Sequence, residues 1–194
     1  RMRGRDAVLQ GGLERHDFDA VILCTGYRHH MPFMSRELRL DTVNRLYPPG
    51  LYKGVVFHST PRLMYLGMQD QFYTFNMFDA QGWFARDVIL GRKSVPDAAA
   101  REGDMRKWQD LELKVGRADT TAAIVFQTAY IRDLLEGTNY PAVDWDAIIE
   151  LFKAWELDKL ADITTYRDKG FASAFTGTVG VVGATPWLFD GPEP

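Results

Sequence analysis

Two histidines stand side by side at positions 29 and 30, just after an apolar run that ends in Thr25-Gly26-Tyr27. Imidazole is a common zinc ligand. Adjacent residues of an extended segment point to opposite faces, whereas two ligands of one metal must share a side, as positions i and i+4 of a helix do. The chain has only four histidines and one cysteine. We therefore expect no metal site at this pair.

A second candidate for chemistry is the glycine-rich stretch TGTVGVVGA, residues 176–184. Its spacing matches neither the G-x-G-x-x-G fingerprint nor a P-loop, and Pro186-Trp187 follow it where either motif would need a helix. We interpret the stretch as a tail segment. The sequence contains no dinucleotide fingerprint and no G-x-S-x-G elbow.

The apolar run that precedes the histidines is more informative about the fold. Four consecutive apolar residues, Ala20 to Leu23, predict a strand covered on both faces. The run ends in small residues and Gly26, and glycine allows another backbone or a cofactor to approach closely. Taken alone, these residues favour a simple change from strand to turn.

Composition limits the classes of function. The chain has 194 residues, of which 46% are hydrophobic and 25% charged, which predicts a globular fold. A net charge of −3 from well-mixed residues argues against nucleic acid or a membrane surface as partner. No apolar run approaches the roughly 18 to 20 residues of a membrane span. The single cysteine, Cys24, cannot form an intramolecular disulfide and favours a cytoplasmic location.

Short strands come first in the predicted order of elements, and helices follow. The strands are a hairpin around Gly11-Gly12 that leads into the apolar run, then LYKGVVFH (51–58) and RLMYLGMQ (62–69). The helices are expected at about 76–90, with Asn76 as N-cap, and at about 97–115, 118–136 and 144–161. This order suits an α+β domain or the closing section of an α/β protein. The strand-like start favours a C-terminal piece of a longer chain.

Ordered blocks of the sequence resemble the flavin-containing monooxygenases, and within them the bacterial branch that acts on trimethylamine. The blocks are FDAVILCTGYRHHMPF (18–33), NRLYPPGLYKGVVF (44–57) and LMYLGMQDQFYTFNMFDAQGWFARDVILG (63–91). Cys24 stands where the family's ATGY-type motif usually has alanine. TYRD, TGT and TPW, which begin at residues 165, 176 and 185, continue the resemblance.

The resemblance implies an α/β fold with two Rossmann-like dinucleotide-binding domains, of which this chain is the C-terminal portion. In this family an NADPH-binding domain interrupts a FAD-binding domain. Residues 1–27 would then end the NADPH-binding domain, with Thr25 and Gly26 at the crossing between the domains. Residues 28–194 would complete the FAD-binding domain with a helical extension. Both glycine-rich phosphate loops would lie upstream.

The activity that the resemblance implies is the N-oxygenation of a small tertiary amine, trimethylamine, by O2 through a C4a-hydroperoxyflavin, with FAD and NADPH as cofactors. It also implies a homodimer. Two alternatives stay open: a monooxygenase for sulfides or other soft nucleophiles, and a truncated interaction module without catalysis. We expect the chain on its own to be inactive and to bind neither cofactor tightly.

The candidate site residues lie mostly in the block GMQDQFYTFN, residues 67–76. Asp70 is the candidate catalytic carboxylate, which would orient a water or pair with the cationic amine product. Gln71 and Thr74 are the expected FAD contacts, because they precede a helix whose positive end favours a reduced flavin. Arg167 of TYRD resembles a position near the NADP phosphate or ribose, and a structural salt bridge to Asp168 or a neighbouring residue is the alternative.

Aromatic side chains are the expected contacts of a methylated amine, because its cationic form is attracted to the ring face. Phe72 and Trp155 are the candidates that match aromatic positions of the family. Trimethylamine monooxygenases tend to have tryptophan where this chain has Phe72, which puts the preferred amine in doubt. Trp83 lies on the apolar stripe of its helix and is expected in the core.

Overall fold

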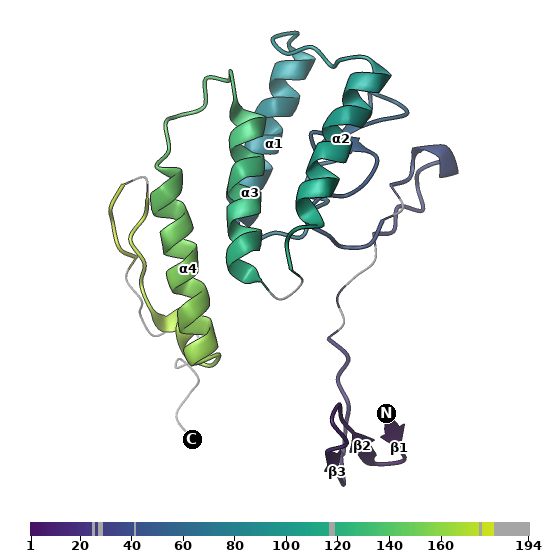
Figure 1. Cartoon of the computed structure of the whole chain (residues 1–194), viewed down its shortest axis with the longest axis vertical. Helices are drawn as coiled ribbons and strands as arrows, with labels where there is room; N and C mark the ends of the chain where they lie inside the picture. Colours follow the sequence, from purple (N-terminus) through teal and green to yellow (C-terminus); the bar gives the residue numbers. More distant parts are fainter. Residues whose placement is uncertain (25, 27–28, 41, 117–118, 175, 181–194) are drawn as a thin grey trace, which may run out of the picture.

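Four α-helices form the body of the protein in the computed structural model, which describes residues 1–24, 26, 29–40, 42–116, 119–174 and 176–180. The helices are α1 (Thr74–Ile89), α2 (Ala98–Glu112), α3 (Thr120–Leu135) and α4 (Trp145–Ala161). Figure 1 shows α3 between α4 and α2, and α3 packs against both α1 and α4. The four predicted helices are confirmed to within a few residues at each end.

Aspartate caps fix the start of three of these helices. Asp97, Asp119 and Asp144 accept hydrogen bonds of 2.9, 2.8 and 3.0 Å from the backbone amides three residues further on. Helix α1 differs, because it begins after Tyr73 and has neither a side-chain cap nor an acidic residue in its first turn. The expectation that Asn76 caps this helix is wrong: the helix starts two residues earlier, at Thr74.

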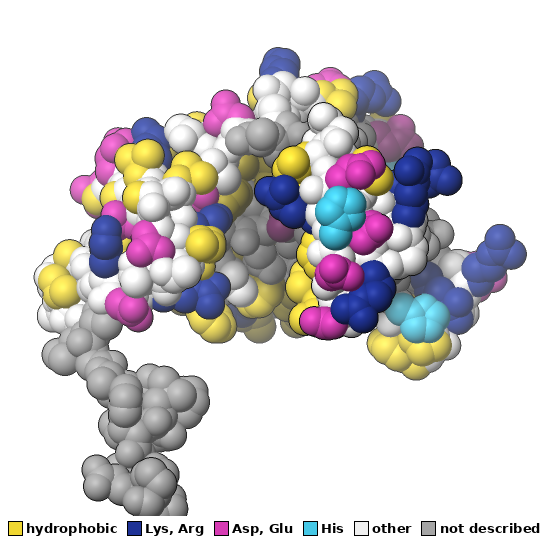
Figure 2. Space-filling view, turned by 90° about the horizontal axis from the view of Figure 1, so that it is seen from below, with side chains coloured by type: hydrophobic (Ala, Val, Ile, Leu, Met, Phe, Trp, Pro, Cys, Tyr) yellow, Lys and Arg dark blue, Asp and Glu magenta, His cyan; other side chains and the backbone are white. Residues whose placement is uncertain are grey.

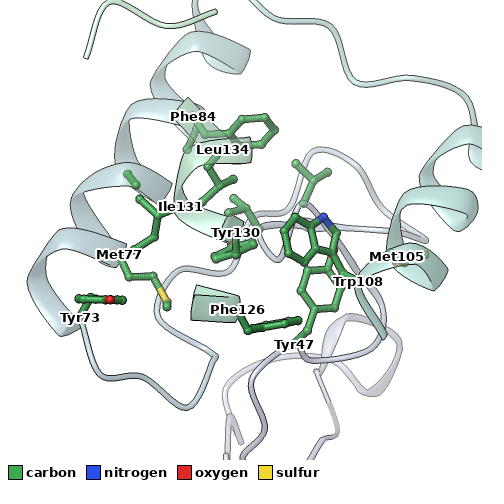
Figure 3. Packing of buried hydrophobic residues seen from close by; sticks show 14 of the residues in the cluster. Tyr47, Tyr73, Met77, Phe84, Met105, Trp108, Phe126, Tyr130, Ile131 and Leu134 are labelled. Atoms are coloured by element: carbon green, nitrogen blue, oxygen red, sulfur yellow. The ribbon is translucent and has the colours of Figure 1, made fainter. Parts of the chain in front are cut away.

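Aromatic rings fill the space between the helices (Figure 3). Trp108 of α2 stacks on Tyr47 at a centroid distance of 6.0 Å and meets the edges of Phe126 and Tyr130 of α3. Met77 of α1 is fully buried in the same cluster. Burial of side chains of this size contributes about 1.5–3 kcal/mol each, so this cluster is what holds α1, α2 and α3 together.

Two small antiparallel sheets precede the helices. The first comprises β1 (Met2–Arg3), β2 (Asp6–Val8) and β3 (Glu14–Arg15), with Ala7 opposite both Met2 and Arg15. The second comprises β4 (Leu51–Tyr52) and β5 (Val56–Phe57), with Leu51 opposite Phe57. The short 3₁₀ segments η1 (Arg36–Leu38) and η2 (Tyr166–Asp168) complete the elements. The expected α/β class, short strands followed by helices, is confirmed.

The segment 51–58 differs from its prediction as one strand. Lys53 and Gly54 have φ angles of 52° and 62°, so the chain reverses there and forms a hairpin of two short strands. The predicted strand 62–69 is reduced to a single bridge between Met64 and Val56. The alternation of apolar residues could not reveal this turn, because it depends on a left-handed lysine.

Residues 1–24 form an extended N-terminal arm that carries the first sheet away from the helices (Figure 1). The predicted strand at Ala20 to Leu23 is extended but has no strand partner among the described residues. Val21, Ile22 and Leu23 are 55%, 84% and 79% exposed. The predicted burial is therefore not seen in this chain. The hairpin around Gly11-Gly12 is confirmed by the pairing of β2 with β3.

Acidic and basic side chains are interspersed on the surface that Figure 2 presents, with apolar side chains between them. None of the described helices has both the length and the apolarity needed to cross a bilayer. Trp83 is half-buried on the surface of α1 rather than in the core, because it packs edge-on against Tyr140 and beneath the guanidinium of Arg86.

Candidate active site

The segment Asp70-Gln71-Phe72 connects the second sheet to α1 and is held at both ends by one side chain. Gln127 of α3 is fully buried. Its amide nitrogen donates to the carbonyl of Asp70, and its amide oxygen accepts from the backbone N–H of Phe72 over 2.8 Å. The single glutamine therefore fixes the backbone on either side of Gln71.

A second anchor holds Asp70 from the opposite direction. Its backbone N–H donates to the carbonyl of Arg45 over 2.9 Å. Glu112, at the end of α2, accepts from the Arg45 guanidinium at 2.9 and 2.5 Å and from the backbone N–H of Leu46 at 3.0 Å. Such a charge-assisted pair, with one partner mostly buried, keeps the 45–46 loop in place beside Asp70.

Asp70 and Phe72 line the same cavity, which has a volume of about 660 Å³. The cavity lies between the 43–46 loop, the 70–72 segment, the end of α2 and the start of α3, and Arg45, Glu112, Asp119 and Thr120 also line it. The Asp70 side chain is exposed, and one of its oxygens accepts from the Gln71 backbone N–H at 3.1 Å. A carboxylate and an aromatic ring thus face one space that could hold a small molecule.

The start of α1 adjoins this segment. Its first backbone N–H groups have no intrahelical acceptors, and no side chain caps them. The side-chain oxygen of Gln71 is buried and has no hydrogen-bond partner in the described part of the chain. Thr74, the first residue of the helix, is exposed. The backbone N–H groups at the start of α1 thus have no side-chain cap, and the side-chain oxygen of Gln71 has no hydrogen-bond donor, in the described part of the chain. These polar groups are available to a ligand.

Tyr73, which follows the 70–72 segment, anchors it to α3 and α4. Its hydroxyl shares a 2.8 Å hydrogen bond with Thr128, and its ring packs edge-on against Phe152 of α4 at 4.3 Å. Burial raises the pKa of Tyr73 to about 12, and the hydrogen bond with Thr128 opposes this rise. The side chain is thus a neutral anchor rather than a proton donor near neutral pH.

A buried network supports the residues just before Asp70. Gln69 donates to Tyr130 over 2.9 Å, and Gln81 of α1 donates to Gln69 over 2.8 Å. Gln81 also accepts from the backbone of Gly67 at 2.7 Å. The Tyr130 hydroxyl donates in turn to the carbonyl of Lys53. Buried polar groups that are all satisfied in this way hold a unique backbone course.

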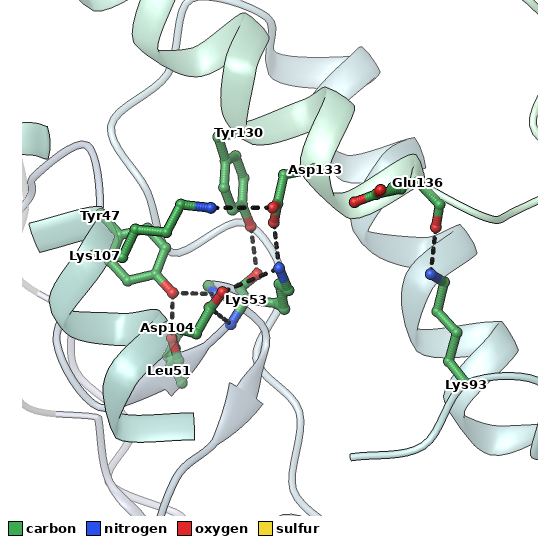
Figure 4. A network of polar contacts seen from close by, with 10 residues as sticks. Tyr47, Leu51, Lys53, Lys93, Asp104, Lys107, Tyr130, Asp133 and Glu136 are labelled. Atoms are coloured by element: carbon green, nitrogen blue, oxygen red, sulfur yellow. Dashed lines mark hydrogen bonds and ion pairs between the residues drawn. The ribbon is translucent and has the colours of Figure 1, made fainter. Parts of the chain in front are cut away.

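An ion cluster closes the network on the solvent side (Figure 4). The Lys53 ammonium lies 3.0 Å from Asp104 of α2 and 2.5 Å from Asp133 of α3. Burial alone would lower the pKa of Lys53, but the hydrogen bonds and charges of Asp133 and Asp104 raise it. Lys53 and Asp133 also line a second cavity of about 360 Å³. Because the Lys53 ammonium is engaged by carboxylates of both α2 and α3, we assign this cluster a structural role.

Trp155 and Arg167 lie together in a second place. Trp155 of α4 packs edge-on against Tyr166 at 5.3 Å, and Arg167 donates to the Tyr166 hydroxyl over 2.8 Å. Among the described residues Arg167 forms no salt bridge with Asp168, and its side chain is exposed. Trp155 is absent from the described lining of the cavity, and Lys159 lies 5.0 Å from its ring.

Gly26 has a φ angle of 78°, which only glycine adopts readily, and a side chain there would meet no atom within 4 Å. At this position glycine therefore serves the backbone conformation rather than a close approach to the described atoms. Thr25, Tyr27 and the TPW block at 185–187 lie outside the described residues.

Sequence reasoning missed Gln127, Glu112 and Arg45. Gln127 stands in the apolar stretch AAIVFQTAYI of α3, and a lone glutamine on a buried helix face is a signal that could have identified it. Nothing near Glu112 or Arg45 indicates their pairing, because they are 67 residues apart.

Comparison with known proteins identifies relatives of the chain as a whole. No protein-family model matches the chain. A trimethylamine monooxygenase of Pelagibacter ubique (strain HTCC1002) is 53% identical over 187 residues, which are 96% of this chain and 42% of that protein. A plant relative, flavin-containing monooxygenase FMO GS-OX-like 7 of Arabidopsis thaliana, is 26% identical over 157 residues, 77% of this chain and 33% of that protein.

The crystal structure of Tmm from Pelagibacter sp. strain HTCC7211 superposes with a TM-score of 0.86 at 48% identity, over 98% of this chain and 42% of that one. This chain thus spans about two fifths of the length of its bacterial relatives, and it matches their C-terminal part. The chain is homologous to the C-terminal part of the bacterial trimethylamine monooxygenases and so belongs to the flavin-containing monooxygenase family.

Proposed function

We propose that the chain is the C-terminal portion of a FAD- and NADPH-dependent monooxygenase that converts trimethylamine to its N-oxide. The observation that carries this proposal is the shared cavity of Asp70 and Phe72 beside the uncapped start of α1. The similarity to enzymes named trimethylamine monooxygenases supports the choice of substrate.

The residues around α1 fit a flavin. The buried, unpartnered oxygen of Gln71 is an acceptor suited to the imide N–H of the ring system. The positive end of α1, with Thr74 at its first position, suits the negative charge that the ring carries when reduced. When bound, FAD reduced by NADPH supplies the activation of O2, so the chain itself needs no nucleophile. Gln71 and Thr74 would bind and orient the ring.

The cavity fits a small amine. The ring of Phe72 would attract the cationic form, and the carboxylates of Asp70 and Asp119 line the same space. Asp70 would orient a water or pair with the cationic product. Trp155 does not line this cavity, so its proposed aromatic contact with an amine would be made at a second place, beside Tyr166 and Lys159. Arg167, exposed beside Tyr166, would bind a phosphate or ribose oxygen of NADP.

For the domain plan, we propose that residues 1–27 end an NADPH-binding domain, that Thr25 and Gly26 form the crossing, and that residues 28–194 complete the FAD-binding domain. The exposed run Val21 to Leu23 supports this plan, because its composition suits a strand buried on both faces of a larger sheet. A homodimer and a cytoplasmic location, suited to a chain with one cysteine, are part of the proposal.

The test joins the chain to the N-terminal portion of the Pelagibacter ubique relative and assays NADPH- and O2-dependent product formation from trimethylamine and from a small dialkyl sulfide. We expect N-oxide as the main product and a loss of activity of about 100-fold or more in Asp70→Asn. Asp110→Asn, which removes an exposed carboxylate of α2, is the matched control. Sulfide oxidation without N-oxide formation would overturn the assigned substrate.

Comparison of the 194-residue chain with the joined protein tests whether flavin binding needs the upstream portion. We expect the 194 residues alone to purify without bound flavin and the joined protein to purify yellow. Flavin absorbance that stays with the 194-residue chain through gel filtration would show that the upstream portion is not needed for cofactor binding.

A further inference from the structure

We infer that Gln127 is a positioning residue of the proposed flavin site, which sets the distance of Asp70 and Gln71 from the ring by fixing the backbone between them. The inference rests on the proposed function. Its physical basis is the pair of hydrogen bonds from one buried amide to the two peptide groups that flank Gln71.

The geometry of these bonds is specific. An amide has one donor and one acceptor end at a fixed separation. Gln127 uses the donor end for the carbonyl of Asp70 and the acceptor end for the N–H of Phe72. The two groups belong to the peptide units on either side of Gln71, so a rotation of that residue's backbone would break at least one of the bonds.

Among the described contacts, only those of Gln127 reach both peptide groups that flank Gln71. The Gln71 backbone N–H is bonded only to the carboxylate of the preceding residue, at 3.1 Å. The Asp70 backbone N–H is held by the carbonyl of Arg45, which fixes the start of the segment but not its course toward α1. Gln127 is therefore the contact on which the direction of the Gln71 side chain depends.

Position matters here because a displacement of about 1 Å at a catalytic group can cost about 100-fold in rate. Asp70 lines the cavity, and Gln71 has a buried acceptor without a partner. A loosened segment would leave both side chains present but less often in the productive arrangement. The expected signature is a fall in kcat with little change in the affinity for the amine.

The first test substitutes Gln127→Met, which conserves volume and removes both hydrogen bonds. In the joined, flavin-loaded protein without NADPH, we expect amide hydrogen exchange in the peptide spanning residues 69–76 to accelerate about tenfold. Gln81→Met is the matched control, because Gln81 is equally buried in α1 but bonds to Gly67, Gln69 and Tyr130 rather than to the 70–72 segment. The acceleration of hydrogen exchange in the 69–76 peptide should be clearly smaller in Gln81→Met than in Gln127→Met.

The second test measures kinetics and the flavin absorption spectrum. We expect kcat to fall about tenfold or more in Gln127→Met with a KM for trimethylamine within about twofold of wild type. Gln127→Glu keeps the size and the acceptor for Phe72, but its buried carboxyl can donate to the Asp70 carbonyl only when protonated, so it should recover part of the rate as the pH is lowered. It also serves as the second variant if Gln127→Met folds poorly.

The outcomes separate the two proposals. Unchanged exchange in Gln127→Met, or faster exchange with unchanged kcat, would overturn the positioning role. A wild-type protein that binds flavin but oxygenates neither amine nor sulfide would overturn the proposed function, and with it the catalytic part of this inference. The exchange measurement would still show whether Gln127 fixes the segment.

Discussion

The hydroxyl of Tyr130 lies against Gly54 so closely that a methyl group added to the glycine would overlap it. Gly54 has a φ angle of 62°, and its amide donates to the buried hydroxyl of Tyr47 at 3.1 Å. The turn between β4 and β5 is thus fitted to a tyrosine of α3, 76 positions along the chain. This contact ties the second sheet to the helix that holds the 70–72 segment.

Gly54→Ala should therefore be strongly destabilising. The added methyl overlaps both Tyr130 and Gln69 and stands on a left-handed residue. Overpacking and backbone strain together predict a loss of about 2–4 kcal/mol in unfolding free energy, measured by urea denaturation. Gly103→Ala is the control: this glycine lies within α2 with open space around it, so a gain of about 0.5–1 kcal/mol is expected. Equal effects at both positions would contradict the fit.

Tyr130→Phe removes a hydroxyl that accepts from Gln69 and Gln81 and donates to the carbonyl of Lys53. Each of these groups would be left in the interior with fewer partners. We expect a loss of about 1–3 kcal/mol in unfolding free energy. Tyr140→Phe, which removes an exposed hydrogen bond to Asp79, should cost about 0.5 kcal/mol or less. A ranking in the opposite order would contradict the importance of the buried network.

Alkaline pH should destabilise the protein through Tyr73. Burial raises its folded pKa to about 12 from the usual value of 10.0, so the folded state retains a proton that the unfolded state releases. The stabilisation is fully present below about pH 10 and is lost as pH rises toward 12, with a slope of up to about 1.4 kcal/mol per pH unit. Tyr73→Phe cannot titrate there, so the difference in unfolding free energy between it and wild type should shrink across this range. A constant difference would refute the assignment.

Phe72→Trp should improve amine binding. The larger indole face attracts a cation more strongly than a phenyl ring does, and Phe72 lines the cavity. In the joined protein we expect the KM for trimethylamine to fall about two- to fivefold with kcat nearly unchanged. The KM for a dialkyl sulfide, which has no charge, should not change. Phe75→Trp, at an exposed position of α1, is the control, and a similar gain there would argue against a site at Phe72.

The helices were predictable from the sequence because their signals are local. Asp97, Asp119 and Asp144 stand at the starts of α2, α3 and α4, and apolar spacing marked their lengths. The segment 51–58 was misjudged as one strand, because a left-handed Lys53 has no sequence signature. The start of α1 was placed at Asn76, a good capping residue that the chain does not use for this purpose.

The site was predictable only in part. The resemblance led to Asp70, Gln71 and Phe72, and the structure brings Asp70 and Phe72 to one cavity. The contacts of Gln127 and Glu112 could not be predicted, since each joins segments more than 50 residues apart. Such pairs depend on how α2 and α3 pack against the loops, which periodicity does not encode. The roles of Arg167 and Trp155 stay predictions.

The N-terminal arm has a consequence for how the chain responds to proteases. Its ion pairs, Arg5 with Asp19 and His16 with Asp6, stay within the arm, and Figure 1 shows its sheet apart from the helices. The exposed, extended backbone of residues 20–24 fits a protease cleft without prior unfolding. We expect a cut there to release a short sheet and to leave the aromatic cluster around Trp108 whole, so that limited proteolysis of this chain yields the helical body as a discrete fragment.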